Sequence, residues 1–261
     1  MQKKILVALH KSYPTPPQEL YLPVQAGAAV GEDFGVQRDD IGDNISALNP
    51  YFCELTALYW AWKNLDCDYI GLVHYRRYFV GKLKFCINGN CISVLSQKEA
   101  DRLLSRTDVI LPKKRNYYIE TLYSHYAHTM YVEPLDEAGR IIDEIYPAYS
   151  KEFARLKKRR SAHMFNMLVM KKSVLNEYCT WLFDILFKLK DRIDVSQYDD
   201  FHARFFGRVS ELLLDVWINT NRIKYCEVKM HYTEHVNWLQ KGARFLKAKF
   251  GHKKYEVSDN R

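Results

Sequence analysis

The sequence has 261 residues, of which 48% are hydrophobic and 27% are charged, and its net charge is +8. This composition is typical of a folded globular protein with one large domain, and it excludes intrinsic disorder over most of the chain. No apolar run reaches the roughly 20 residues that a transmembrane helix needs. The short apolar run after Met1 also has no small-residue cleavage site of a signal peptide behind it. We therefore expect the protein to remain in the cytoplasm.

Basic residues are concentrated in two segments. One is the sequence RLKKRR at 155–160, called the basic cluster below, and the other is the stretch 241–254, which has six Lys and Arg residues and no acidic residue. Basic surfaces bind the phosphates of nucleic acids, lipids or nucleotides, although a single cluster is often only a solvated face. The six cysteines are scattered and form no CxxC motif, so we expect free thiols and no zinc site.

Strands and helices are expected to alternate along the chain. Short apolar runs predict strands at 4–10, 69–73, 108–112, 164–170 and 224–230. Helical spacing and capping signals, including a capping box at Ser96–Glu99, predict helices at 50–64, 96–106, 134–146, 148–158, 173–189, 204–220 and 237–250. This order predicts an α/β domain over residues 1–236, with a mostly parallel central sheet flanked by helices. A basic amphipathic C-terminal helix and tail would follow at 237–261.

Basic side chains follow three of the expected strands. In a parallel sheet these strand ends lie at the edge where ligands bind. Because cations repel one another, we expect an anionic group such as a diphosphate between them. The alternative is that one arginine pairs with a structural carboxylate and that the histidine is a core residue. The side chains concerned are His10, Lys11, His74, Arg76, Arg77, Lys113, Lys114 and Arg115.

Two further polar groups are candidates for chemistry. In the loop at 39–46 we expect Asp39 to cap the chain, and Asp43 and Asn44 to bind a ribose, a base or a sugar hydroxyl. On the helix at 204–220, Arg208 and Glu211 are three residues apart and share a face. Glu211 is then either a partly desolvated general base or only the partner of Arg208 in an ion pair.

Several enzyme and binding classes lack their sequence signatures. The chain has no GxGxxG or P-loop, no GxSxG and no HExxH. Tyrosines alternate with basic residues near 117–126, as in single-strand nucleic-acid binders, but no RRM, KH or helix-turn-helix motif accompanies them.

Some longer segments resemble a known family. These are GDNIS (42–46), NPYFCELTA (49–57), HYRRYF (74–79), LPKKRN (111–116) and GRVSELLLD (207–215). They resemble the bacterial capsular and exopolysaccharide glycosyltransferases, a family long catalogued as a domain of unknown function, and the likeness covers about residues 4–250. It implies a GT-A-type fold and transfer of a sugar from a nucleotide donor, and some relatives are galactofuranosyltransferases.

Most GT-A enzymes carry an Asp-x-Asp that holds Mn²⁺ or Mg²⁺ on the diphosphate. The corresponding place here, after the strand at 69–73, is occupied by His74-Tyr75-Arg76. We therefore expect no required metal cofactor, because fixed cations can neutralise the leaving diphosphate as a divalent ion does. The loop residues Asp39, Asp40 and Asp43 leave Mn²⁺ or Mg²⁺ as the alternative.

The resemblance turns these candidates into a specific expectation. It is an inverting hexosyltransferase that uses a UDP-linked donor such as UDP-galactofuranose, a polyprenyl-diphosphate-linked glycan as acceptor, and Glu211 as catalytic base. His163 and Asn166 would line the acceptor side. The donor would be bound by His10, Asp43, Asn44, His74, Arg76, Arg77, Lys114 and Arg208.

The expected location is the cytoplasmic face of the cell membrane. The C-terminal helix would lie in the plane of an anionic membrane surface, and nucleic acid would not be a partner. Two other classes stay open: a basic nucleic-acid-binding protein, and a glycoside hydrolase whose two carboxylates are Asp43 and Glu211.

Overall fold

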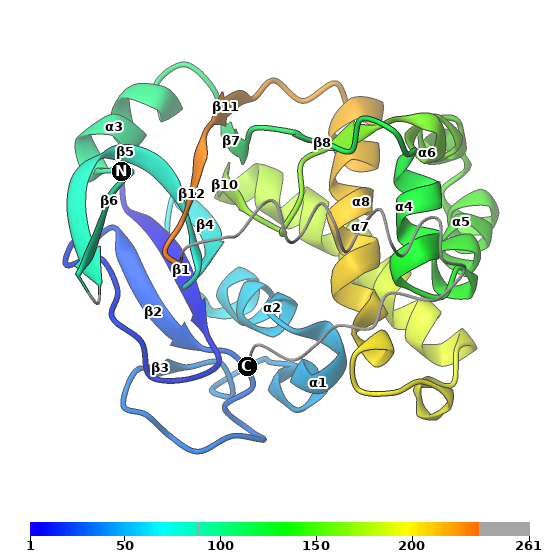
Figure 1. The fold of residues 1–261 in the computed structure, drawn as a ribbon, viewed down its shortest axis with the longest axis horizontal. Coiled ribbons are helices and arrows are strands. Elements are labelled where there is room, and N and C mark those ends of the chain that lie inside the picture. Colours follow the sequence, from blue (N-terminus) through cyan, green and yellow to red (C-terminus); the bar gives the residue numbers. More distant parts are fainter. Residues whose placement is uncertain (88, 235–261) are drawn as a thin grey trace.

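The computed structural model describes residues 1–87 and 89–234, and the expected C-terminal helix and tail therefore lie outside the described residues. A central sheet has the strand order β3-β2-β1-β4-β10-β7-β11 (Figure 1). Parallel pairs join β1 to β2 and β4, β2 to β3, and β11 to β7, whereas β10 runs antiparallel to both of its neighbours. The predicted mostly parallel sheet is confirmed. The strands of this path are β1 (Lys3–Leu9), β2 (Tyr21–Gln25), β3 (Gln37–Arg38), β4 (Tyr69–His74), β7 (Val109–Pro112), β10 (Leu168–Lys171) and β11 (Cys226–Val228).

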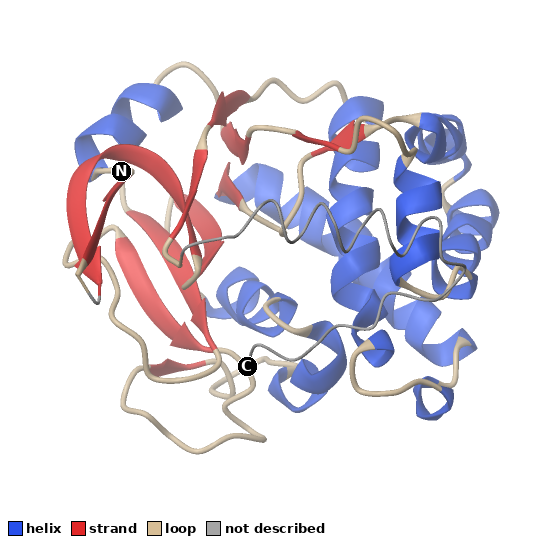
Figure 2. Ribbon diagram, viewed as in Figure 1, coloured by secondary structure: helices blue, strands red, loops and turns tan. Residues whose placement is uncertain are grey.

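Both faces of the sheet are buried, which explains the continuous apolar runs in its strands. In β1, Leu6 and Ala8 pack into a core shared with most of the helices, whereas Ile5 and Val7 point to the opposite core. Figure 2 shows most of the helices gathered beside the sheet rather than around it. The helices are α1 (Asn49–Phe52), α2 (Leu55–Asn64), α3 (Gln97–Leu104), α4 (Leu122–Thr129), α5 (Glu133–Ile145), α6 (Pro147–Lys158), α7 (Lys172–Arg192) and α8 (Phe205–Thr220).

The second core lies under a long hairpin that the sequence analysis did not predict. The hairpin is formed by β5 (Arg77–Ile87) and β6 (Asn90–Val94), and β12 (Met230–Tyr232) pairs with β5. It begins three residues after β4 ends, so Arg77 is both the first residue of the hairpin and a neighbour of the sheet edge. A separate short pair, β8 (Arg115–Asn116) and β9 (Ser161–Ala162), lies near α4 and α6.

The helix expected at 50–64 is interrupted. The interruption is at Cys53, whose φ is +50°, and it divides α1 from α2. The Asn49 side chain does not cap the helix start; its amide donates to the Cys53 carbonyl and the Thr56 hydroxyl at the interruption instead. Tertiary packing sets this arrangement, because Asn49 lies directly against Gly27, where a Cβ atom would come within 2.5 Å of the Asn49 side chain. The capping box at Ser96 and Glu99 is confirmed at the start of α3.

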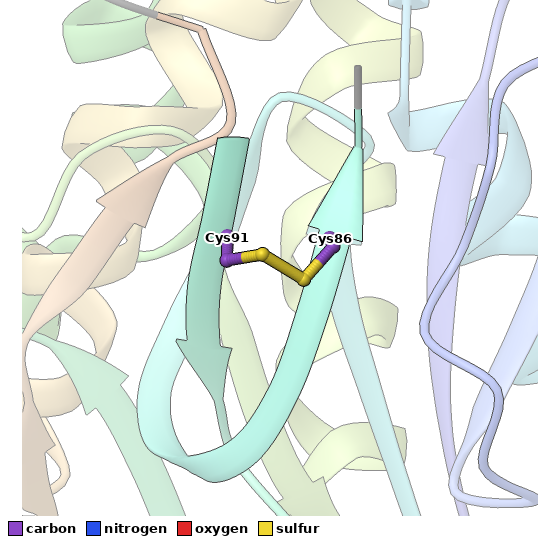
Figure 3. The surroundings of a disulfide bond; sticks show 2 residues. All are labelled: Cys86 and Cys91. Atoms are coloured by element: carbon purple, nitrogen blue, oxygen red, sulfur yellow. A yellow bond between two sulfur atoms is a disulfide. The ribbon is translucent and has the colours of Figure 1, made fainter. Parts of the chain in front are cut away.

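One pair of cysteines corrects the expectation of six free thiols. Cys86 on β5 and Cys91 on β6 form a disulfide bond (Figure 3). The antiparallel register places the two residues directly opposite each other, which sequence spacing alone did not suggest. The cysteines at positions 53, 67, 179 and 226 are free, as expected.

Candidate active site

A cavity of about 990 Å³ opens between the end of β7, α4, α8 and the segment that contains β12. One part of its lining is apolar and aromatic, with Leu122, Tyr126, Met130 and Phe201 among its residues. The other part is strongly basic. Among the described residues that line the cavity, Glu211 is the one carboxylate, and the cationic lining residues are Lys113, Lys114, Arg115, Arg208 and Lys229. This surface favours an anionic ligand.

Glu211 lies on the cavity-facing side of α8 and is only 4% exposed. Arg208 Nη1 donates to Glu211 Oε1 at 3.3 Å, and the nearby Phe165 backbone N–H lowers the pKa of the carboxyl. Oε2 is buried and accepts no hydrogen bond of good geometry from a described residue. Burial raises the pKa of Glu211, opposed by the positive charge of Arg208 and reinforced by the negative charge of Glu54. Both roles considered for this residue are therefore compatible with the structure. A buried carboxylate with one unpartnered oxygen and a raised pKa has the properties of a general base.

Arg77 lies between this cavity and the end of β4. Its guanidinium is 4.3 Å from the centre of the Phe165 ring and 5.8 Å from that of Tyr232, and both rings line the cavity. Burial lowers the pKa of Arg77, while the nearby carboxylate of Glu211 opposes that shift. The structure gives Arg77 no ion pair with a described carboxylate, and its Nε is buried without a partner. A desolvated guanidinium with donors left over is suited to a phosphate.

A second group of basic residues lies at the ends of β1 and β4. The rings of His10 and His74 are 5.6 Å apart. Burial, and then the charge of Arg77, place the pKa of His74 well below its usual value, so this histidine is neutral near pH 7. Arg76 stacks on Tyr75 and has its Nε 3.6 Å from Glu234. This long contact corresponds to the alternative that one of the two arginines pairs with a structural carboxylate. Lys114 is in the cavity lining, on the other side of β10.

The loop at 39–46 is more structural than expected. Asp39 is fully buried and accepts hydrogen bonds from the backbone of Gly27 and Ala28, which confirms its capping role. Asn44 donates to the carbonyls of residues 40 and 42 and accepts from the backbone of residue 46, so its amide closes the turn. Asp43 is exposed and accepts from the Tyr59 hydroxyl. Neither residue is in the cavity lining.

The positions of His163 and Asn166 correct the expectation that they line the acceptor side. His163 is fully buried, and its two ring nitrogens contact Asp215 and Glu227, so it joins α8 to β11. Asn166 is also buried; its amide nitrogen donates to Glu54, and its oxygen accepts from the Ser210 hydroxyl. Neither residue is in the cavity lining, and the polar side-chain atoms of both are already engaged by other protein groups.

Two residues near the site escaped the sequence analysis. Glu54 precedes α2, yet its charge acts on Glu211, Arg208 and His10. Phe165 has a φ of +75°, and Asn166 after it has +53°. Two consecutive left-handed residues without glycine cost of the order of 1–3 kcal/mol each. No sequence pattern marks either feature.

Three of the five cations in the basic cluster at 155–160 form ion pairs within the protein, with two carboxylates between them. Arg155 and Arg159 both pair with Glu152, and Lys157 pairs with Asp136. These internal pairs reduce the cluster's value as a nucleic-acid surface.

No metal-binding group is found in the part of the chain that the structure describes: nowhere do three or more His, Cys, Asp and Glu side chains gather so that they could hold a metal ion. None of the described helices is long and apolar enough to cross a membrane.

The fold and the cavity define an α/β protein with a basic cavity beside the end of the central strand β7. The chain belongs to the family described as a domain of unknown function, DUF4422, which matches residues 4–222. It is similar to a solved apo structure of the WbbM bifunctional glycosyltransferase, with a TM-score of 0.81 and 29% identity over 90% of this chain. The expected glycosyltransferase-like fold is thereby confirmed. The chain spans 46% of that protein's length. No curated protein matches the sequence.

Proposed function

We propose that this protein is a glycosyltransferase that moves a sugar from a nucleotide-sugar donor to an acceptor hydroxyl. The observation that carries the proposal is Glu211, a buried carboxylate with a raised pKa in a cavity whose basic side consists of five Lys and Arg residues. The likeness to part of a longer bifunctional glycosyltransferase supports it.

The donor diphosphate is assigned to the cations at the strand ends. Arg76, Arg77 and Lys114 would bind the phosphate oxygens, with His10, His74 and Arg208 around them. The fixed charges of Arg76, Arg77, Lys114 and Arg208 would stabilise the leaving nucleoside diphosphate without a divalent ion. Asp43 is the candidate for a ribose hydroxyl, because it is the exposed carboxylate of its loop. Turnover that persists in EDTA would support this assignment, and complete loss restored by Mn²⁺ or Mg²⁺ would overturn it.

Glu211 would deprotonate the acceptor hydroxyl. The hydroxyl proton passes to the carboxylate, the oxygen forms a bond to the anomeric carbon, and the bond to the diphosphate breaks with its electron pair on the leaving group. A direct displacement of this kind inverts the anomeric configuration. The apolar part of the cavity, around Tyr126 and Phe201, would then receive the acceptor sugar.

The finer details follow from the sequence resemblance. We infer a UDP-linked donor, with UDP-galactofuranose as the specific candidate, and a polyprenyl-diphosphate-linked acceptor in capsular or exopolysaccharide synthesis. Such an acceptor would place the enzyme at the cytoplasmic face of the membrane, where the basic segment at 241–254 would meet anionic lipid.

The experiment is a panel of UDP-, GDP- and dTDP-sugars measured by thermal shift, followed by a transfer assay with the donor that stabilises the protein. A ligand present at 100 times its Kd stabilises the folded state by about 2.7 kcal/mol, which is easily detected. Stabilisation by one nucleotide sugar that Arg77→Ala abolishes would support the proposal. No response to any nucleotide sugar, together with salt-dependent RNA or DNA binding, would favour the nucleic-acid alternative.

The hydrolase alternative is disfavoured by the position of Asp43. A two-carboxylate glycosidase needs both groups at the scissile bond, whereas Asp43 contacts Tyr59 and is not in the cavity lining. Release of free sugar from a glycoside without any nucleotide sugar would reverse this conclusion.

A further inference from the structure

The turn between β9 and β10 places an aromatic ring among the cations of the site. Phe165 is the ring residue, and its backbone is in the left-handed region with a φ of +75°. Glycine, or to a lesser extent asparagine, adopts this conformation most readily, and a bulky aromatic residue is an outlier there. The side chain therefore has a use that offsets the strain.

Hydrogen bonds of the Asn166 side chain anchor the turn to neighbouring segments. The Asn166 amide donates to the Glu54 carboxylate at 2.8 Å and to the Gly207 carbonyl at 3.2 Å, and its oxygen accepts from Ser210 at 2.8 Å. These three bonds tie the turn to α8 and to the start of α2. They fix the direction in which Phe165 leaves the backbone.

Two guanidinium groups lie over the Phe165 ring. The Arg77 guanidinium is 4.3 Å from its centre and that of Arg115 is 5.8 Å from it. Arg115 also lies 5.2 Å from the Tyr117 ring. The two arginines come from β5 and β8, and both lie near the Phe165 ring, which belongs to the turn between β9 and β10. Neither forms an ion pair with a carboxylate among the described residues, and a ring face attracts a guanidinium while leaving its N–H donors free.

We propose that Phe165 is a positioning residue that holds Arg77 and Arg115 as a preformed pair for the phosphates of the substrate. The ring replaces the structural carboxylate that would otherwise hold the two half-buried arginines in place but would also occupy their donors. This inference rests on the proposed function, because the pair is assigned to a phosphate-bearing substrate.

The test is the affinity of the full-length protein for inorganic diphosphate, measured by calorimetry at fixed ionic strength, and the KM for the donor. Phe165→Asn removes the ring but suits the left-handed backbone, so relieved strain should offset the packing lost against the two cores and keep the Tm close to that of the wild type. Its Kd for diphosphate and its donor KM should nevertheless rise about tenfold, or about 1.4 kcal/mol. Phe165→Tyr keeps a ring face and should bind diphosphate like the wild type. Phe165→Leu keeps bulk without a ring and should behave like Phe165→Asn; it serves as the second variant if the asparagine protein does not fold.

Arg77→Ala separates failure of this inference from failure of the proposed site. If Arg77→Ala weakens diphosphate binding but Phe165→Asn and Phe165→Leu do not, the positioning role is refuted and the anion site stands. If Arg77→Ala also binds diphosphate normally, the anion site itself is wrong. A Phe165→Tyr protein as weak as Phe165→Leu would likewise refute a role for the ring face.

Discussion

Replacing Glu211 with Gln tests the assigned base most directly. Glutamine retains the shape of the side chain and its contact with Arg208, which is 3.3 Å away, but it cannot accept the acceptor's proton. General base catalysis contributes about 10²–10⁴-fold to a rate. We therefore expect kcat to fall within that range while the donor KM changes little, because the donor is held by cations and not by this carboxylate.

The same substitution should not destabilise the protein at neutral pH. Burial raises the pKa of Glu211 above its unfolded value, so the folded state binds this proton more tightly than the unfolded state does. The wild type then loses stability as the pH rises from the unfolded pKa through the raised folded pKa. Each unit of raised pKa corresponds to about 1.4 kcal/mol. Glu211→Gln lacks this titration, so its Tm should equal or exceed that of the wild type at pH 7, and the difference should diminish in acid.

The assay is kcat at saturating donor and acceptor from pH 5 to 9, together with Tm over the same range. In the wild type, the acidic limb of the pH dependence of kcat should lie above the ordinary pKa range of a carboxyl group, because Glu211 is desolvated. Glu137→Gln is a matched control, since Glu137 pairs with Arg140 at the same three-residue spacing on α5, outside the cavity. If Glu211→Gln turns over nearly as fast as the wild type, or loses activity only in parallel with a lowered Tm, Glu211 is an ion-pair partner and the mechanism is wrong.

Three further outcomes are expected. Arg76→Ala and Arg77→Ala should each lower kcat/KM by about a hundredfold, or about 3 kcal/mol, without loss of folding; unchanged donor kinetics in both variants would contradict the diphosphate assignment. Replacing Cys86 and Cys91 with Ser should lower stability in a denaturant titration by about 2 kcal/mol, as expected for so short a loop; a reductant should shift the wild type by the same amount and the double variant not at all. Truncation after Gln240 should abolish flotation with anionic vesicles and spare transfer to a soluble acceptor; full-length protein that ignores such vesicles at low salt would rule out the membrane role of the tail.

The sequence was sufficient for five of the seven strands in the central path and for most helices, because their signals are local, but not for β2, β3 or α4. Continuous apolar runs predict strands buried on both faces, and the Ser96 capping box predicts the start of α3. The β5–β6 hairpin also had a local signal that was overlooked, the dipeptide Asn88-Gly89 between alternating apolar residues. The interruption at Cys53 had none, because it depends on the contact between Asn49 and Gly27, which are distant in sequence.

The candidate site also contains residues with a local sequence signal and residues without one. Helical spacing was enough to relate Glu211 to Arg208, and strand order was enough to bring basic residues to one edge of the sheet. Glu54 and Phe165 depend on contacts through space: Asn166 reaches Glu54 across 112 residues of sequence. The role of His163 was assigned from the family resemblance alone, whereas in the structure its ring nitrogens contact the buried Asp215 of α8 and the exposed Glu227 of β11.

The anion site and the base are electrostatically coupled. In the free protein, the cations Arg208 and Arg77 lower the pKa of Glu211, while burial raises it by more. A bound diphosphate would neutralise those cations and exclude water, and both changes strengthen Glu211 as a base. When the nucleoside diphosphate leaves, Arg208 and Arg77 are no longer neutralised. Their positive charges then favour loss of the acquired proton from Glu211. A carboxylate placed among cations would therefore be a stronger base with the donor bound and would release its proton more readily once the product has departed.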